Sequence, residues 1–399
     1  MSVIQRHIDS ILPELVALRR DLHSHPELGF EETRTATRVV EVLRETGRLS
    51  IRTGVAKTGV VAVLNGDKSA PCLALRADMD ALPIVEQTGL GYASRSPGRM
   101  HACGHDGHTT CLLGAARVLA RMADELPGPV KFIFQPAEEN GGGGRQMVEA
   151  GVLEDPPVEA AIALHAWPTQ PVGTIAVRSG PAMASTDTCR IRVEGRGAHG
   201  AYPHRGIDPI LAASHIVVAL QSIVARNVDP IDHAVVTVGS IHGGTVCNII
   251  PTECTLEATL RAHNARTREG LRESVRRIAE NTARALGATA HVEMEEGYPV
   301  TVNDPALSRW VVDVGREVLG PDRVVTDEPP SMGGEDFAYY GQKVPAVMFR
   351  LGVRPPGADS YPGLHNPMFD FNDDALAVGV RMFCELAVRF SRRPPATAG

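Results

Sequence analysis

Apolar residues in the first part of the chain recur with two different spacings. Apolar positions three and four residues apart predict amphipathic helices at residues 4–23, 31–46 and 109–122. Short runs rich in apolar β-branched residues predict buried strands at residues 59–64, 72–76, 130–134 and 158–164. Strands that alternate with helices in this way are typical of an α/β sheet with helices on both faces.

The pattern changes near residue 185 and returns near residue 298. Between them the periodicity predicts, in order, strand, helix, two strands, helix and strand, at residues 188–194, 209–225, 234–241, 254–261, 266–286 and 290–295. This βαββαβ order is the ferredoxin-like arrangement. A helix at 307–319, a strand at 346–351 and a helix at 373–390 then resume the α/β pattern, and a frayed tail is expected at 392–399. The sequence therefore predicts a discontinuous domain, residues 1–184 and 299–399, with residues 185–298 inserted as a second domain.

Composition and charge narrow the class of protein. The 399 residues are 43% hydrophobic and 22% charged, as in an ordinary globular protein. The formal net charge of -7 argues against a nucleic acid or an anionic membrane surface as the partner. The seven cysteines are scattered without a Cys-x-x-Cys pair, which predicts reduced thiols and a cytoplasmic location. Residues 1–27 carry charges throughout, and no run of about 18 apolar residues occurs, so neither a signal peptide nor a spanning helix is expected.

Candidate metal ligands gather in one eight-residue segment before the helix expected at 109–122. Its sequence is His101-Ala102-Cys103-Gly104-His105-Asp106-Gly107-His108. Thiolate and imidazole groups suit borderline-soft transition metals, and zinc sites often combine them. A glycine-containing polar turn that caps the next helix is the alternative interpretation.

Two adjacent carboxylates, Glu138 and Glu139, follow the strand predicted at 130–134. In an open α/β sheet, ligands bind at the carboxyl ends of the strands. One of the two carboxylates could coordinate a metal while the other takes a proton from water activated by that metal. A solvated acidic turn is the alternative, and the pair alone does not exclude it.

Single histidines and a short acidic segment complete the candidates. His165 follows the apolar run that ends at residue 164, and His365 lies in a Gly-Leu-His-Asn-Pro turn. Either imidazole could be a ligand or a structural residue. Asp78 and Asp80 follow the strand predicted at 72–76, where a carboxylate could orient a ligand histidine, or where both could belong to a turn.

Several motifs in the same order resemble one family over nearly the whole chain. They are Arg19-Arg20-Asp21-Leu22-His23-Ser24-His25-Pro26-Glu27-Leu28, Arg76 to Pro83, Met100 to His108, Gln135 to Glu139, Ala198-His199-Gly200 with Pro203-His204, Gly333 to Phe337, and His365-Asn366-Pro367. The sequence resembles the metal-dependent aminoacylase and carboxypeptidase family, in its branch of hippurate hydrolases and indole-acetyl-amino-acid hydrolases. That resemblance implies a three-layer α/β catalytic domain, of the zinc-exopeptidase kind, with an inserted ferredoxin-like lid and dimerisation domain.

The resemblance also implies the residues of a centre with two divalent ions per subunit, zinc, manganese, cobalt or nickel. Cys103 would bridge the ions. His105 and His165 would hold one of them, and Glu139 and His365 the other. Relatives with a His-x-Asp pair have a histidine where Asp78 stands, so Asp78 is not expected to be a ligand, and Asp80 remains as a supporting carboxylate. Glu138 matches the general base of the family.

Three residues of the inserted domain are implied to meet the substrate. His199 would stabilise the oxyanion of the tetrahedral intermediate in a neighbouring subunit's site, although packing in a glycine turn is an alternative. Asn248 would lie near the substrate. Arg261 could pair with the α-carboxylate of the substrate, because its planar guanidinium binds a carboxylate through two parallel hydrogen bonds. The inserted domain is accordingly expected to form a homodimer or a higher homo-oligomer.

The expected activity is hydrolysis of the amide bond of a small N-acyl amino acid, hippurate-like or N-acetylated, to a carboxylic acid and a free amino acid. Activated water would attack the carbonyl, with Glu138 as the general base. A dipeptidase or carboxypeptidase of the same family is the nearer alternative. A hydrolase with Cys103 as nucleophile and a metal sensor without enzymatic activity are the distant ones.

Overall fold

The chain forms two compact units in the computed structural model, which describes residues 2–395. The first unit comprises Met1–Gly180, Val302–Pro329 and Asp336–Gly399, and the second comprises Pro181–Thr301 and Pro330–Glu335. The sequence places the two boundaries within a few residues of these positions but gives no sign of the short segment at 330–335. The last four residues of the expected tail, 396–399, lie outside the described residues.

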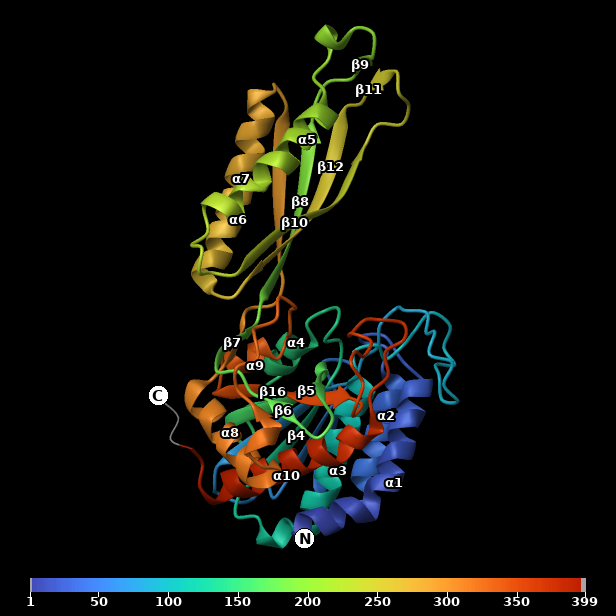
Figure 1. Ribbon diagram of the computed structural model, residues 1–399, viewed down its shortest axis with the longest axis vertical. Coiled ribbons are helices and arrows are strands. Elements are labelled where there is room, and N and C mark those ends of the chain that lie inside the picture. The colour runs from blue at the N-terminus through green and yellow to red at the C-terminus, as the bar shows by residue number, and fades with distance from the viewer. Residues whose placement is uncertain (1, 396–399) are drawn as a thin grey trace. The chain divides into compact units, whose positions relative to one another are not determined.

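An eight-stranded mixed sheet forms the centre of the first unit (Figure 1). Its strand order is β1 (Leu49–Val55), β2 (Gly59–Leu64), β4 (Val130–Gln135), β3 (Cys72–Asp78), β5 (Val158–Pro171), β16 (Ala346–Arg354), β6 (Ile175–Ala176) and β15 (Val324–Val325). The four middle strands, β4, β3, β5 and β16, are parallel to one another, whereas β2 and β6 on either side of them run antiparallel to β4 and β16. Every residue of β3 and β4 is buried, which explains why both strands are continuous apolar runs interrupted by only a few polar residues.

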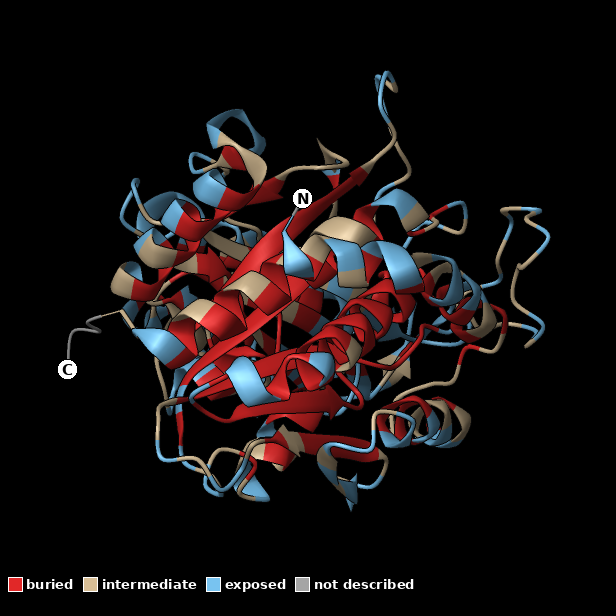
Figure 2. Ribbon diagram, turned by 90° about the horizontal axis from the view of Figure 1, so that it is seen from below, coloured by how far each residue is buried: buried red, intermediate tan, exposed pale blue. Residues whose placement is uncertain are grey.

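Helices cover the sheet of the first unit, as the alternation of strands and helices predicts. α1 (Val3–Ser24), α3 (His105–Arg121) and α10 (Leu376–Arg392) pack against one another, and α3 and α10 also contact β3. Gly114 of α3 permits this packing, because a Cβ there would lie 2.6 Å from a methyl of Val380 and 2.8 Å from one of Leu15. Figure 2 shows the buried strands between helices that expose only one side. The remaining elements are α2 (Thr33–Arg44), η1 (Ala123–Glu125), α4 (Gly143–Glu149), α8 (Pro305–Leu319), η3 (Pro321–Arg323), α9 (Ala338–Gly341) and η4 (Asp373–Ala375).

The second unit has the ferredoxin-like fold that the sequence predicts. β8 (Ser185–Glu194), α5 (Pro209–Leu220), α6 (Ser222–Arg226), β10 (Ala234–Gly243), β12 (Glu253–Ala262), α7 (Ala265–Ala285) and β13 (Thr289–Glu296) follow in this order. The antiparallel strand order is β10-β12-β8-β13. Alternate residues of β8 and β12 are buried beneath α5 and α7. A small ribbon of β9 (Ala198–His199) and β11 (Ile249–Ile250) and a turn, η2 (Pro203–Arg205), complete this unit, while β7 (Gly180–Met183) and β14 (Thr301–Asn303) contain the points where the chain passes between units.

Three local expectations differ from the structure. α3 begins at His105, four residues earlier than expected, because Gly104 adopts a left-handed conformation and starts the helix there. β5 continues to Pro171, since it pairs with β16 beyond residue 165. The helix expected at 209–225 is divided into α5 and α6. By length and composition alone Pro209–Arg226 could cross a membrane, but the inner face of α5 packs on the sheet of the second unit.

Candidate metal centre

The five expected ligands come from separate segments of the first unit and converge at one edge of its sheet. Cys103 precedes α3 and His105 lies in the first turn of that helix, whereas Glu139 follows β4. His165 lies inside β5 rather than at its end, and His365 lies in the loop after β16. Asp78 pairs with Gln135, so the carboxyl ends of the parallel strands β3 and β4 meet at the same level. The topology of parallel strands therefore brings these side chains together.

The donor atoms form two groups that share the sulfur of Cys103. In the first group, donors of Cys103, His105 and His165 lie within 4.8 Å of one another, with Sγ of Cys103 3.6 Å from Nε2 of His165. In the second group, donors of Cys103, Glu139 and His365 satisfy the same limit, and Nε2 of His365 lies 3.2 Å from Oε1 of Glu139. These are the two ligand sets that the resemblance implies.

The protonation states suit a cation. Burial, followed by the neighbouring histidine charges, lowers the pKa of His165 well below its ordinary value, so the imidazole is neutral. Its Nδ1 lies 2.9 Å from the carbonyl oxygen of Ala166, which leaves the lone pair of Nε2 facing Cys103. Burial and the carboxylates of Glu139 and Glu138 raise the pKa of the Cys103 thiol well above its ordinary value. A thiolate at this position therefore needs a compensating positive charge.

An unsatisfied nitrogen points to the same conclusion. Nε2 of His105 is fully buried and has no hydrogen-bond partner among the described residues. Its nearest carboxylate oxygens belong to Asp78 and Glu139, each 3.8 Å away. Although burial opposes a charge on His105, the carboxylates of Asp78, Asp80 and Glu139 raise its pKa to about 10, and a metal cation at Nε2 would take the place of that proton. Thiolate, imidazole and carboxylate donors around an unpartnered nitrogen fit a divalent transition metal.

Asp80 contacts two of these residues from behind. Its Oδ1 lies 3.3 Å from Nδ1 of His105, and its Oδ2 accepts the backbone N–H of Glu139 at 2.9 Å. The same carboxylate thus orients a ring in one group and the backbone of a residue in the other. This geometry suits the supporting role expected for Asp80.

Glu138 lies beside the donors and is 5% exposed. One of its oxygens lies within 4.8 Å of donors of His105 and Glu139, and another contact is the backbone N–H of Asp336 at 3.4 Å. The preceding residue, Ala137, has a φ of 51°, which is unusual for a residue with a Cβ. This turn directs both glutamates to the same place.

The three expected substrate residues lie in the second unit. His199 pairs with Ile249 in the β9–β11 ribbon, and the N–H of Gly200 donates to the carbonyl of Asn248 at 2.7 Å, so the exposed residues His199 and Asn248 are neighbours. Arg261 is half-buried near the end of β12, and burial lowers its pKa. The structure therefore brings His199 and Asn248 together but not Arg261.

The comparisons with known proteins agree with this geometry. The sequence profile of peptidase family M20/M25/M40 matches residues 74–389. The chain belongs to this family. N-acetyl-L-cysteine deacetylase from Bacillus subtilis is 40% identical over 96% of this chain and 89% of its own length, and IAA-amino acid hydrolase ILR1-like 4 from Arabidopsis thaliana is 40% identical over 94% and 85%. A solved dinuclear metal-binding M20 peptidase from Bacillus subtilis superposes with a TM-score of 0.83 at 38% identity, covering 96% of this chain and 99% of that one. The M20 chain described here is accordingly a metal-dependent hydrolase.

A buried network centred on Arg76, a residue for which the sequence predicts no role, lies behind the donors. Arg76 donates to Asp78 at 2.7 Å, to Gln135 at 3.0 Å and to Asp336 at 3.0 Å. Asp78 also lies 2.7 Å from Nδ1 of His108, whose Nε2 accepts the backbone N–H of Ala166 at 2.8 Å. Both nitrogens of His108 are thus occupied, and the third histidine of the motif supports the strand that carries His165. An arginine inside a wholly buried strand was the sequence signal for this network.

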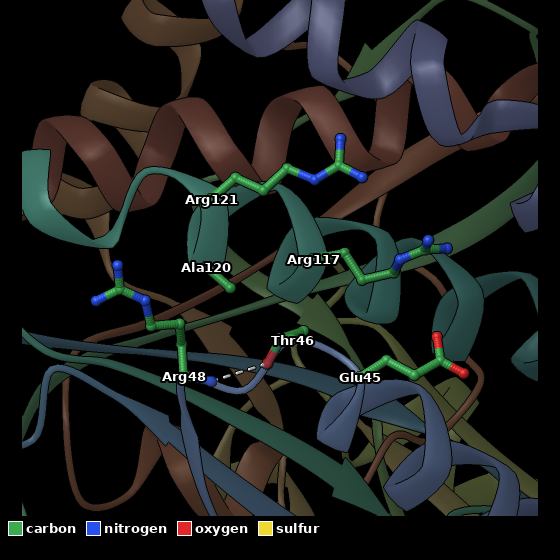
Figure 3. A pocket seen from close by; sticks show the side chains of 6 residues that line it. All are labelled: Glu45, Thr46, Arg48, Arg117, Ala120 and Arg121. Carbon is green, nitrogen blue, oxygen red and sulfur yellow. Dashed lines mark hydrogen bonds between the residues drawn. The ribbon is translucent and has the colours of Figure 1, made fainter.

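The first unit also has a basic pocket, whose lining lacks the combination of thiol, imidazole and carboxylate donors found at the candidate metal centre (Figure 3). It has a volume of about 420 Å³ and is lined by Glu45, Thr46, Arg48, Arg117, Ala120 and Arg121. The three arginines already donate to Asp124, Glu14 and Ser10. Since Arg117 is twelve residues after His105 on α3, the pocket lies about 18 Å along the helix from the metal-ligand candidates.

Proposed function

We propose that this M20 hydrolase cleaves the amide bond of N-acyl amino acids at a centre for two divalent ions. The main observation that supports this proposal is that two triads of donors share the sulfur of Cys103, with Glu138 beside them. The names of the two relatives described above, a deacetylase of an N-acetyl amino acid and a hydrolase of IAA-amino acid conjugates, support the substrate class.

The five metal-ligand candidates would be shared between the two ions. Cys103, His105 and His165 would hold one ion, and Cys103, Glu139 and His365 the other. Bound divalent ions supply a Lewis acid for the scissile carbonyl and make water acidic enough to ionise near neutral pH. Zinc, manganese, cobalt and nickel all accept this donor set, so site geometry and metal availability in the cell would together select the ion.

Glu138 moves the proton. Its carboxylate takes one proton from the attacking water as the new C–O bond forms, and returns it to the amide nitrogen as the C–N bond breaks. Water and amide thus become a carboxylic acid and a free amine, and Glu138 ends in its starting state. Glu138 as a whole residue is 5% exposed, so little bulk water competes for the proton.

The inserted unit supports the proposal that two copies complete each site. Arg261 is eight residues along β12 from Glu253, and the β9–β11 ribbon lies beyond Glu253, so Arg261 is more than about 26 Å from His199 and Asn248 along the sheet. A small N-acyl amino acid cannot reach both ends of this sheet. We infer that Arg261 and the pair His199 and Asn248 do not serve the same bound substrate in one copy, and that His199 and Asn248 serve the site of a partner in a homodimer or larger oligomer.

The alternatives have less support. A free Cys103 nucleophile is disfavoured because burial and adjacent carboxylates raise the pKa of its thiol. A peptidase acting on dipeptides would use the same centre, and the solved M20 peptidase supports this alternative.

All seven cysteines are free thiols in the structure, in keeping with the proposed cytoplasmic location.

A substrate panel with controlled metal content tests the proposal. The purified protein is stripped with a chelator, reloaded with one divalent ion at a time, and assayed with N-acetyl and N-benzoyl amino acids and with dipeptides. We expect no turnover after stripping, recovery with one or more ions, and preference for N-acyl amino acids. Dipeptides as the better substrates would replace the proposal with the peptidase alternative. Activity that survives stripping but is lost on alkylation would favour the Cys103 nucleophile.

A further inference from the structure

A cavity of about 510 Å³ opens next to the two triads, within the first unit. Most of its lining surface is apolar, with Trp167, Pro168, Tyr361 and Leu364 as apolar residues and Arg354 and Asp359 as charged ones. Apolar pockets of 300–1,000 Å³ are the usual size of small-molecule sites.

The chain connects this cavity directly to the expected metal ligands. Trp167 is two residues after His165 on β5, and the two rings lie 6.1 Å apart. Leu364, another lining residue, immediately precedes His365. A lining residue thus belongs to the segment of each triad, so the cavity adjoins both.

The strand register gives the direction of the cavity. Arg350 of β16 pairs with His165, Gly352 pairs with Trp167, and Arg354 pairs with Pro171. Arg354 therefore lies four residues beyond the level of His165 on β16, about 13 Å along the strand. The cavity extends away from the triads in this direction, so a group that enters it would point away from the bond to be cleaved.

The walls are held in place by specific contacts. The ring of Trp167 is stacked on the guanidinium of Arg350 at 3.8 Å, and its Nε1–H donates to Glu328 at 3.0 Å. On the other side, the hydroxyl of Tyr361 donates to the carbonyl of Asp370 at 2.8 Å. Both aromatic side chains of the lining are therefore held by hydrogen bonds, which suits selection of a bound group by its size.

The volume of the cavity determines which acyl groups can fill it. An apolar cavity of about 150 Å³ is enough to bind benzene. The methyl of an acetyl group would leave most of the 510 Å³ empty, whereas an aromatic ring or a medium-length chain would contact both Trp167 and Tyr361. Burial of that additional apolar surface favours the larger acyl group.

We propose that this cavity is the acyl subsite and that it selects bulky apolar acyl groups over acetyl. The inference rests on the proposed function, because it names the acyl class for that same centre. Trp167, Tyr361 and Leu364 form the walls, and the exposed Thr169 lies at its edge, where a larger side chain can narrow it without contacting a metal-ligand candidate.

Thr169→Trp tests the subsite, with Thr37→Trp as the matched control, since Thr37 is an exposed threonine on α2. The values of kcat/KM for N-benzoylglycine and N-acetylglycine are compared on the metal-loaded enzymes. We expect the wild type to prefer the benzoyl substrate. Thr169→Trp should lower kcat/KM for the benzoyl substrate about tenfold or more and change the value for the acetyl substrate by less than about twofold, as steric exclusion from an apolar pocket does. Thr37→Trp should leave both values unchanged.

Calorimetric titration with benzoate and acetate separates the inference from the proposed function. Both anions carry a carboxylate, so only a subsite for the ring makes benzoate bind more tightly, and Thr169→Trp should abolish that difference. If the wild type hydrolyses neither substrate, the proposed function fails, and the titration still tests the cavity. Equal losses for both substrates in Thr169→Trp, or no preference for benzoate in the wild type, would overturn the acyl subsite.

Discussion

The carboxylate of Glu32 accepts the backbone N–H of Ala137 at 2.8 Å and so holds the turn that carries Glu138 and Glu139. Its other oxygen accepts the hydroxyl of Thr58 at 2.6 Å. Glu32 is fully buried, and Ala137 has the positive φ of 51°. The strained turn is therefore fixed by a carboxylate from a segment more than a hundred residues earlier in the chain.

Replacing Glu32 should disturb this turn. Glu32→Ala leaves the N–H of Ala137 buried without an acceptor, which should lower the free energy of unfolding by roughly 1–3 kcal/mol and reduce kcat. Glu32→Gln retains an acceptor oxygen and should have the smaller effect on both. Denaturant unfolding and steady-state kinetics measure the two quantities, and equal kcat for wild type and Glu32→Ala would show that the turn keeps its shape without Glu32.

Glu138→Gln separates proton transfer from metal binding. The amide has the size of the carboxylate but cannot take a proton from water, so kcat should fall by roughly 10²–10⁴-fold. The metal content, measured by mass spectrometry after gel filtration, should stay at the wild-type value. Wild-type turnover in the metal-loaded variant would remove Glu138 from the proposed mechanism.

Asp80→Asn should weaken metal binding. Asp80 contacts the ring of His105 and the backbone of Glu139, and loss of such a supporting carboxylate typically lowers metal affinity by about 10–100-fold. Competition with a coloured chelator measures the affinity. Asp9→Asn, on the exposed side of α1, is the matched control and should retain the wild-type affinity.

Deprotonation of His23 should lower the free energy of unfolding at alkaline pH. The buried ring lies 2.8 Å from Asp106 and 3.3 Å from Glu86, and although burial opposes its charge, these carboxylates raise its pKa from 6.5 to about 9. The raised pKa means that the charged ring stabilises the fold fully below pH 6.5 and that this contribution, roughly 3 kcal/mol at most, is lost as the pH rises through about 9.

Unfolding in denaturant between pH 6 and pH 10 measures this dependence. His23→Gln retains polar contacts without titrating, so the free energy of unfolding of this variant should change less over the same range. The same slope in both proteins would assign the pH dependence to other groups.

Mixing two inactive variants tests whether copies share their sites. His199→Ala should lower kcat with the metal content intact, because only a donor to the oxyanion is removed. In a mixture with Glu138→Gln, a mixed dimer combines one intact metal centre with one intact His199, so activity should recover to roughly a quarter of the wild-type value. Mixed dimers, verified by differently tagged copies, that remain inactive would place His199 in the site of its own copy.

The sequence predicts the elements with strong periodicity well and those set by tertiary contacts poorly. α1 and β2 follow from apolar spacing alone. The short strands β6 and β15 could not be predicted, because two residues carry no periodicity and their pairing depends on distant segments. The start of α3 was missed because a polar, glycine-containing segment resembles a loop until Gly104 adopts its left-handed conformation.

The candidate site divides in the same way. Cys103 and His105 are close in the sequence, so residue types and spacing alone suggest them, whereas the positions of His165 and His365 leave a structural role open and only the family resemblance implies that both are ligands. The roles of Arg76 and Glu32 were missed because each acts through a backbone or a side chain that only the folded chain brings near. Residues that act through long-range contacts leave no spacing signal in a single sequence.

The sharing of Cys103 by both triads has a consequence for metal loading and for damage. The first ion to arrive would convert the thiol to a thiolate and so prepare half of the second ligand set, which predicts cooperative uptake of the pair. Because both metal positions share this sulfur, oxidation or alkylation of Cys103 alone would disable both of them at once.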